Sequence, residues 1–287
     1  MELISIIVEG ILIGAIYGLA ASGLSFVFGV MTIINLAHAE LIMLGSFITF
    51  GLWFFFKIDP LLSIFLSVAA ISVFCSFLYK AVVRRILGKM PLVSLILTFG
   101  ISIFLWNFAQ VFFSSTFRSV PYSTGSVGFM GSFFSVNKII SLLIVTAIII
   151  ALHSFLKLTR VGKAIRAVSQ NPDIAAISGI NVDRIRMLGF SIAGALAAVA
   201  GSLISIQWSI YPMMGQDLIL KCFSIVAIGG LGSIPGAFLG GLVLGLAETI
   251  GTQYWDATMA NVIAPMLLIL TFLFRPQGFF GVEERVD

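Results

Sequence analysis

Nine long apolar segments, separated by short polar connections, run along the chain of 287 residues. They occupy residues 4–30, 39–56, 60–79, 92–113, 139–156, 187–208, 218–231, 236–250 and 259–274. A helix crosses the hydrocarbon core of a bilayer with about 20 apolar residues, whereas a barrel strand needs only about 10 and alternates strictly. The pattern therefore predicts an all-α polytopic integral membrane protein with about 8–10 transmembrane or half-membrane helices. The segments 218–231 and 236–250 are short for full spans.

The composition supports a membrane protein without a separate water-soluble domain. Hydrophobic residues make up 60% of the chain and charged residues 10%, against roughly 25% charged residues in soluble domains. The longest hydrophilic stretch, 157–186, is too short to fold by itself. We therefore expect one transmembrane domain over residues 1–287. No Lys or Arg precedes the first apolar segment, so we expect that segment to be retained rather than cleaved as a signal peptide.

Basic residues are concentrated in three places. Of the 16 Lys and Arg residues, four lie at 80–89, six at 157–186, and two, Arg275 and Arg285, near the C-terminus. Basic connections of membrane proteins remain in the cytoplasm, so all three places are predicted to be cytoplasmic. Nine crossings then put the N-terminus outside and the C-terminus inside. In a membrane protein, clustered positive charge indicates which connections lie on the cytoplasmic side of the membrane. We therefore expect no nucleic acid partner.

The hydrophilic segment 157–186 reads "KLTRVGKAIRAVSQNPDIAAISGINVDRIR". Arg160, Lys163 and Arg166 recur every three residues, as on a helix. Asn171-Pro172 interrupts that helix and begins another, because Asn caps helices well and Pro suits their first turn. The second helix, 173–178, ends at Gly179. The segment is either a basic linker attracted to anionic lipid or a docking surface for a partner, and the defined caps favour the docking surface.

Small residues mark a helix break and close helix packing. Glycine and alanine spaced four apart let helices approach closely in lipid, and 232–236 ("GSIPG") predicts a sharp turn between two short apolar segments. Broken helices of this kind commonly border solute sites in transporters. The residues assigned to this break and to packing are Gly229, Gly230, Gly232, Pro235, Gly236 and Gly240.

Asn35, His38 and Glu40 introduce polarity into the otherwise apolar stretch "INLAHAELIMLG", 34–45. The alternatives are a metal site, a proton relay, a solute pathway or a polar loop between buried helices. The chain has two histidines, His38 and His153, in different segments and without H-E-x-x-H spacing, so we expect no metal. We expect no other cofactor. Neither Gly-Lys pair belongs to a phosphate-binding loop, so we expect no ATP hydrolysis by this chain. Nothing in the sequence marks a nucleophile elbow, so we expect no enzyme activity.

Ionisable residues at membrane depth are costly and usually functional. Glu248 lies deep in the segment 236–250, whereas Glu9 and Lys221 lie near segment ends, where their charges are expected to reach the interface. His38, Glu40 and Glu248 would serve a proton-coupled secondary carrier, which is the main alternative to an importer subunit. A membrane scaffold is a third interpretation.

Three stretches resemble the permease of bacterial branched-chain amino-acid ABC importers of the LivH type. They are 29–45, 162–186 and 227–248, and "FRPQGFFG" at 274–281 fits too. The resemblance implies a permease fold of the vitamin B12/ribose importer type in the bacterial inner membrane. It also implies four partners, namely a second related permease subunit, two cytoplasmic ATPase subunits and a periplasmic amino-acid-binding protein. Transport of branched-chain or related hydrophobic amino acids would then draw its energy from the ATPase subunits.

The resemblance also suggests roles for particular residues. Residues bordering the substrate pathway would be Asn35, His38, Glu40, Gly45 and Glu248. Residues coupling the chain to the ATPase would be Arg160, Gly162, Lys163, Arg166, Asn171, Pro172, Asp173, Ala175, Ala176 and Gly179. The general importer signature has Glu-Ala-Ala, three residues and then Gly, but here only two residues separate Ala176 from Gly179. This departure fits a distinct permease class.

Overall fold

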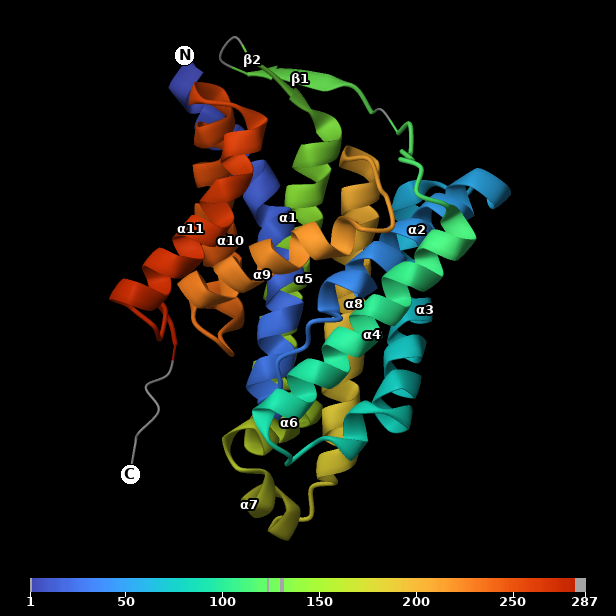
Figure 1. Cartoon of the computed structure of the whole chain (residues 1–287), viewed down its shortest axis with the longest axis vertical. Coiled ribbons are helices and arrows are strands. Elements are labelled where there is room, and N and C mark those ends of the chain that lie inside the picture. Colours follow the sequence, from blue (N-terminus) through green and yellow to red (C-terminus); the bar gives the residue numbers. More distant parts are fainter. Residues whose placement is uncertain (1, 123, 130–131, 282–287) are drawn as a thin grey trace.

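The computed structural model describes residues 2–122, 124–129 and 132–281 (Figure 1), so Arg285 lies outside the described residues. The elements are α1 (Glu2–Met31), α2 (His38–Phe56), α3 (Pro60–Ala81), a short 3-10 helix (Val83–Arg85), α4 (Pro91–Phe113), β1 (Ser126–Phe129), β2 (Ser132–Ser135), α5 (Val136–Leu158), α6 (Arg160–Gln170), α7 (Pro172–Ile177), α8 (Val182–Gln207), α9 (Met214–Gly229), α10 (Ile234–Tyr254) and α11 (Ala257–Phe274).

The predicted all-α polytopic membrane fold is confirmed. Each of the nine apolar segments forms one helix, α1–α5 and α8–α11, in the part of the chain that the structure describes. Seven of these helices are long and apolar enough to cross a membrane. α9 is short, as expected, with 16 residues.

The expectation that 236–250 would be a short helix is wrong, because α10 has 21 residues. Its last turns contain polar residues that lower the hydropathy without ending the helix. The hydroxyls of Thr249 and Thr252 donate to the carbonyl oxygens of Gly245 and Glu248, one turn earlier, at 2.8 Å each. The helix therefore satisfies these polar groups internally and continues to Tyr254.

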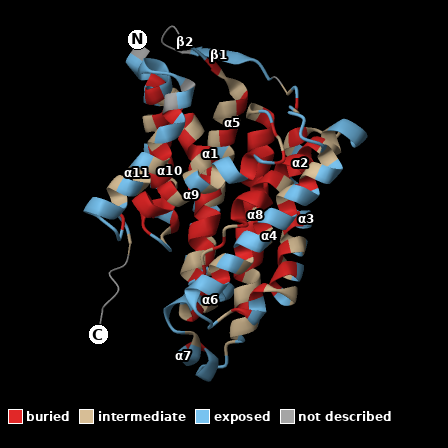
Figure 2. Ribbon diagram, viewed as in Figure 1, coloured by how far each residue is buried: buried red, intermediate tan, exposed pale blue. Residues whose placement is uncertain are grey.

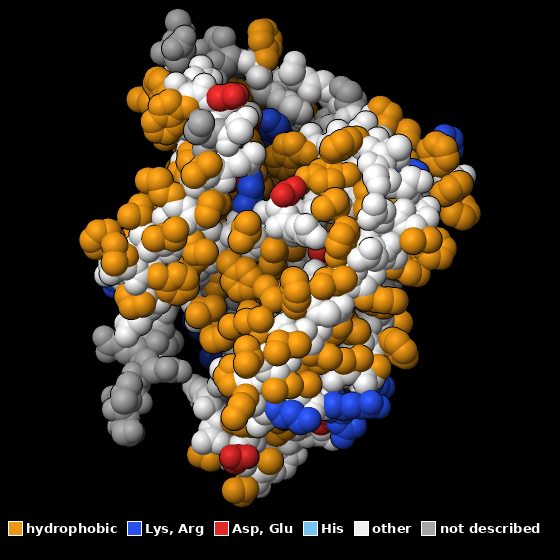
Figure 3. All heavy atoms as spheres, viewed as in Figure 1, with side chains coloured by type: hydrophobic (Ala, Val, Ile, Leu, Met, Phe, Trp, Pro, Cys, Tyr) orange, Lys and Arg blue, Asp and Glu red, His pale blue; other side chains and the backbone are white. Residues whose placement is uncertain are grey.

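The core surrounds α8, which is buried along most of its length and contacts α1, α2 and α3 (Figure 2). Small residues on α8 permit this packing, since a Cβ added at Gly201 would lie 2.1 Å from the carbonyl oxygen of Ile42 on α2. α3, α4 and α5 instead expose large apolar side chains such as Phe65, Phe104 and Leu143. Figure 3 shows a surface that is hydrophobic over most of its height, as a lipid-facing surface requires.

The two ends of the helix bundle differ. The antiparallel β1–β2 hairpin lies at the upper end, near the start of α1, whereas α6 and α7 lie at the lower end (Figure 1). Basic side chains gather at that lower end in Figure 3. The basic segment 157–186 and the start of the chain are therefore on opposite sides of the bundle, as nine crossings predict.

Candidate functional site

The chain reverses direction inside the bundle between α1 and α2. α1 ends at Met31, residues 32–37 are not helical, and α2 begins at His38. The Nε2–H of His38 donates to the carbonyl oxygen of Ala20 at 2.9 Å. Ala20 precedes the end of α1 by eleven residues, or roughly 16 Å along the helix. The segment 32–37 therefore runs back along α1 and starts α2 within the membrane.

Thr98 of α4 satisfies the backbone of this non-helical segment. Its Oγ1 accepts the N–H of Leu36 at 3.2 Å, and its single proton is shared between the carbonyl oxygens of Ile34, at 3.1 Å, and Leu95 on its own helix, at 3.2 Å. Irregular backbone at membrane depth persists only where protein or a water-filled cavity satisfies it. Thr98 was not predicted from the sequence, although the hydroxyl residues Ser94, Thr98 and Ser102 repeat every four positions in α4.

Replacing Thr98 with valine should destabilise the protein by about 1–3 kcal/mol, because it removes the hydroxyl that pairs with two partly buried backbone groups of the segment 32–37. Thermal unfolding in detergent measures the effect. Thr98→Ser keeps the hydroxyl and should retain most of the stability. Thr271→Val is the matched control, since the Thr271 hydroxyl donates within its own helix, to the carbonyl oxygen of Leu267. Equal unfolding temperatures for Thr98→Val and Thr271→Val would contradict this role.

Glu40 occupies the first turn of α2 and is 1% exposed. Its Oε1 accepts a hydrogen bond from Ser102 at 3.1 Å. A Cβ added at Gly215, in the first turn of α9, would lie 2.4 Å from Oε2. The carboxylate therefore lies between the first turns of α2 and α9, where helix dipoles favour negative charge. Within the described residues, Glu40 Oε2 and the amide nitrogen of Asn35 have no hydrogen-bond partner.

His38 and Gly45, which were expected near the pathway, pack at helix interfaces. The His38 ring lies against Gly23 of α1, where an added Cβ would approach it within 2.6 Å. Gly45 lies against the backbone of Ala198 on α8, 2.9 Å from an added Cβ. The structure thus directs His38 toward α1 and Glu40 toward α4 and α9.

Glu248 belongs to a second polar group near the middle of the membrane. Its Oε2 accepts from the Lys221 ammonium at 2.8 Å, and that ammonium lies 3.0 Å from the Tyr17 hydroxyl. Tyr17 is near the midpoint of α1. The expectation that the Lys221 charge reaches the interface is therefore wrong, since it is held by an acidic partner on α10 that the sequence analysis did not assign to it.

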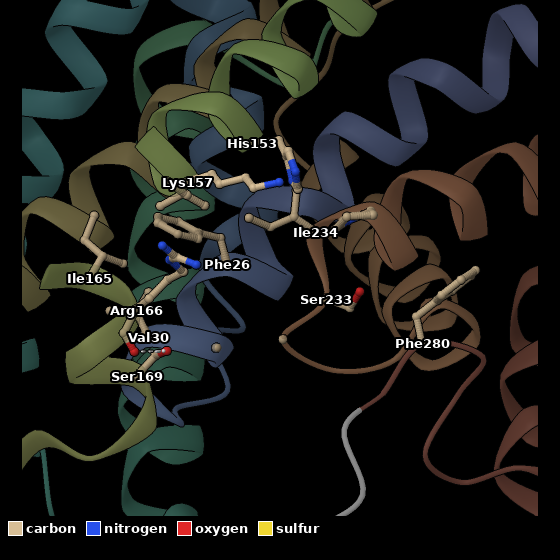
Figure 4. Close-up of a pocket in the computed structure, with 14 residues that line it drawn as sticks. Phe26, Val30, His153, Lys157, Ile165, Arg166, Ser169, Ser233, Ile234 and Phe280 are labelled. Atoms are coloured by element: carbon tan, nitrogen blue, oxygen red, sulfur yellow. Dashed lines mark hydrogen bonds between the residues drawn. The ribbon is translucent and has the colours of Figure 1, made fainter. Parts of the chain in front are cut away.

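Two of the cavities lined by described residues lie toward opposite ends of the bundle. The upper one, of about 590 Å³, extends from the connection 208–213 to Tyr17 and Lys221. The lower one, of about 490 Å³, lies between α1, α5, α6 and the turn before α10 (Figure 4). His153 and Lys157 from α5 and Arg166 from α6 point into the lower cavity.

The segment at the lower end folds as two capped helices. The Thr159 hydroxyl accepts the N–H of Gly162 at 2.9 Å, and the Asn171 side chain accepts two N–H groups of α7 at 3.0 Å each. Gly179 follows α7 with φ of +82°. Arg160, Lys163, Arg166, Asp173 and Ala176 are exposed, whereas Gly162 and Ala175 are buried. Sequence reasoning missed two apolar residues at this tip, Ile174 and Ile177, which are 62% and 88% exposed.

The predicted helix break lies slightly earlier than expected. The turn comprises 230–233, with Gly230 and Gly232 at φ of +92° and +84°, while Pro235 and Gly236 already belong to α10. The backbone N–H groups of Phe279 and Phe280 donate to the carbonyl oxygens of Ile228 and Gly229, at 2.8 and 3.2 Å. The closing segment 274–281 therefore caps the end of α9.

The remaining glycines assigned to the break, Gly229, Gly236 and Gly240, allow α9 and α10 to pack closely. Gly229 and Gly236 lie against each other, since a Cβ added at Gly236 would be 2.1 Å from the carbonyl oxygen of Gly229. Gly240 lies against the carbonyl oxygen of Ile225 on α9, 2.6 Å from an added Cβ. α9 and α10 can therefore fold back on each other within the membrane.

Comparisons with known proteins give one consistent result. A family described as "Branched-chain amino acid transport system / permease component" matches residues 6–272. The branched-chain amino acid permease BraD of Pseudomonas aeruginosa is 34% identical, over 97% of this chain and 95% of its own. LivH of Escherichia coli is 32% identical, over 96% and 94%. A chain of PsaBC from Streptococcus pneumoniae shares the fold, with a TM-score of 0.52, 11% identity and coverage of 94% and 91%. The chain therefore belongs to the family of permease components of branched-chain amino acid transport systems.

Proposed function

We propose that this chain is the transmembrane permease subunit of an ABC importer for branched-chain or related hydrophobic amino acids. The observation that carries the proposal is the 34% identity to BraD across 97% of the chain. The fold would be of the vitamin B12/ribose importer type. The chain would lie in the bacterial inner membrane, with its C-terminus in the cytoplasm.

The proposal includes separate partners for energy and for solute delivery. A second related permease subunit would complete the pathway, two cytoplasmic ATPase subunits would supply energy, and a periplasmic binding protein would supply the amino acid. The absence of a phosphate-binding loop motif in the sequence supports the assignment of ATP hydrolysis to a partner.

The segments that border the pathway would be those that reverse within the membrane. Asn35 and Glu40 belong to the first, and they carry buried polar atoms without partners among the described residues. Glu248 would lie beside the pathway through Lys221. The positions of His38 and Gly45 support a packing role instead.

The proton-coupled carrier is disfavoured by the same geometry. A relay needs ionisable groups that can pass a proton to one another, but His38 donates to a backbone carbonyl of α1 and Glu40 bonds Ser102 on α4. Glu248 is paired with Lys221. These three residues therefore have three different sets of partners.

The tip formed by α6 and α7 would receive the motion of the ATPase. Ala175 holds α7 against the rest of the protein, while Ile174 and Ile177 remain exposed at the extreme lower end. Exposed apolar side chains beyond the membrane are typical of a protein-binding surface. Basic residues of α6 would surround this contact.

Replacing Ile177 with aspartate should lower ATP-driven leucine uptake at least roughly tenfold in vesicles that contain all the subunits, because a charge would enter an apolar contact. The unfolding temperature should stay within about 2 °C of the wild type, since Ile177 is 88% exposed. The control variant Ile177→Val keeps an apolar side chain at this position, so its uptake should equal that of the wild type.

The same vesicles test the proposed function. Wild-type chain without ATPase subunits should transport nothing when a pH gradient is applied, because it lacks its source of energy. Gradient-driven uptake by the chain alone would overturn the importer in favour of the carrier. Normal uptake by Ile177→Asp would contradict the coupling role of α7.

A further inference from the structure

We propose that the upper cavity is a binding subsite for the zwitterionic head and apolar side chain of an amino acid. The inference deepens the proposed function and rests on it. The cavity, of about 590 Å³, falls in the range of about 300–1,000 Å³ that small-molecule sites occupy. It would hold the solute within the permease itself, after release by the binding protein.

Two opposite charges of α9 line the cavity. Asp217 and Lys221 are four residues apart, so they lie on one face of the helix with Cβ atoms roughly 5–6 Å from each other. They do not pair with each other, because Lys221 binds Glu248 and Asp217 accepts from the hydroxyl of Tyr211. A carboxylate and an ammonium are thus presented separately to the cavity.

This pair matches the head group of an α-amino acid. Its ammonium would bind the Asp217 carboxylate and its carboxylate the Lys221 ammonium, each through a charge-assisted hydrogen bond. Burial and the bond to Asp217 raise the pKa of Tyr211 to about 12, so the Tyr211 hydroxyl remains neutral beside the charged pair. Among the described lining residues, Asp217 and Lys221 are the two charged ones, and Lys221 also keeps Glu248 as an acidic partner behind the lining.

Apart from Ser209 and Asn261, the rest of the lining suits an apolar side chain. Tyr17 and Trp208 stack with ring centroids 6.3 Å apart, and Phe117 packs on Tyr211 at 4.8 Å. The other apolar lining residues are Ile204, Met214, Leu218, Leu220, Ala264 and Pro265. Apolar walls with a few placed polar groups are typical of sites that select a small hydrophobic molecule.

The position of the cavity fits a step in transport. It begins at the connection 208–213, on the side opposite α6 and α7, and it reaches Tyr17, near the midpoint of α1. Charged groups at that depth are costly and are usually kept for function. A solute that enters from this side would reach the middle of the membrane while its charged ends remain paired.

Methyl-proton saturation-transfer NMR on the full chain in lipid nanodiscs, without a binding protein, tests the subsite. The probes are leucine, leucinamide, which lacks the carboxylate, and 4-methylpentanoate, which lacks the ammonium. The wild type should bind leucine about tenfold more tightly than either analogue, because each analogue loses one charge-assisted hydrogen bond.

Asp217→Asn is the decisive variant, since asparagine keeps an acceptor for Tyr211 and removes only the charge. Leucine should bind it about tenfold more weakly, with 4-methylpentanoate unchanged. The matched control is Asp59→Asn, which also loses one charge and keeps an acceptor for the N–H of Leu61; its leucine affinity should equal that of the wild type. Unfolding temperatures establish that both variants are folded.

The outcomes separate the subsite from the proposed function. If the wild type bound leucine and 4-methylpentanoate with equal affinity, the cavity would be merely apolar and the proposed subsite would be overturned. The subsite would also be overturned if the wild type and Asp217→Asn bound leucine with equal affinity. Leucine uptake by the assembled wild-type importer, without leucine binding to the chain, would overturn the subsite alone. Absence of any amino-acid uptake by that assembly would overturn the proposed function instead.

Discussion

Replacing Lys221 with methionine should destabilise the protein by about 3–5 kcal/mol, because it leaves the buried Glu248 carboxylate without its counter-charge. The side chains of Lys221 and Glu248 are only 16% and 10% exposed. Glu248 Oε1 has no partner among the described residues even with Lys221 present. Thermal unfolding should show a midpoint about 10 °C or more below that of the wild type.

Two further variants make this result specific to the buried pair. Lys221→Met combined with Glu248→Gln removes both charges and should recover most of the lost stability. Lys138→Met breaks the ion pair between Lys138 and Glu9, whose side chains are 24% and 30% exposed, and should cost about 1 kcal/mol or less. If Lys221→Met unfolded at the wild-type temperature, or if the double variant were less stable than the single one, the pair would not be the stabilising contact inferred here.

The membrane helices were predictable from the sequence because lipid imposes a local requirement. A spanning helix must be apolar over its whole length, and its backbone bonds close within the segment. The start and end of α7 were also predictable, since Asn171, Pro172 and Gly179 act within one turn of their own positions. By contrast, the end of α10 was missed because Thr249 and Thr252 satisfy their hydroxyls inside the helix.

The candidate site was less predictable because it depends on distant residues. Lys221 and Glu248 are 27 positions apart, and Tyr17 is 204 positions from Lys221. Nothing in the local sequence shows that an isolated lysine has a buried acidic partner on another helix. Thr98 likewise bonds a segment more than 60 residues away, although its spacing with Ser94 and Ser102 is visible in the sequence. The polarity of 34–45 was evident, but its partners were not.

Glycine packing between α1 and α10 leads to the second large expected effect. Gly14 and Gly18 of α1 face Gly241 and Gly245 of α10, and these two helices contact each other extensively. A Cβ added at Gly241 would lie 2.3 Å from the Gly18 Cα, far inside the roughly 3.5–4.0 Å of ordinary carbon contacts. The Gly18 Cα belongs to the helix backbone and the added Cβ is fixed to the backbone of Gly241, so no side chain can rotate to make room.

Gly241→Ala should therefore destabilise the protein by about 3 kcal/mol and lower its unfolding midpoint by about 5–10 °C. The helices must separate to admit the methyl group, and in lipid their association depends on packing rather than on the hydrophobic effect. Gly51→Ala on α2 is the matched control, since a Cβ there meets nothing within 4 Å. It adds the same methyl group to a membrane helix and should leave the midpoint unchanged or slightly raised, because alanine favours helix over glycine. Equal midpoints for the two variants would mean that α1 and α10 are not packed at backbone contact.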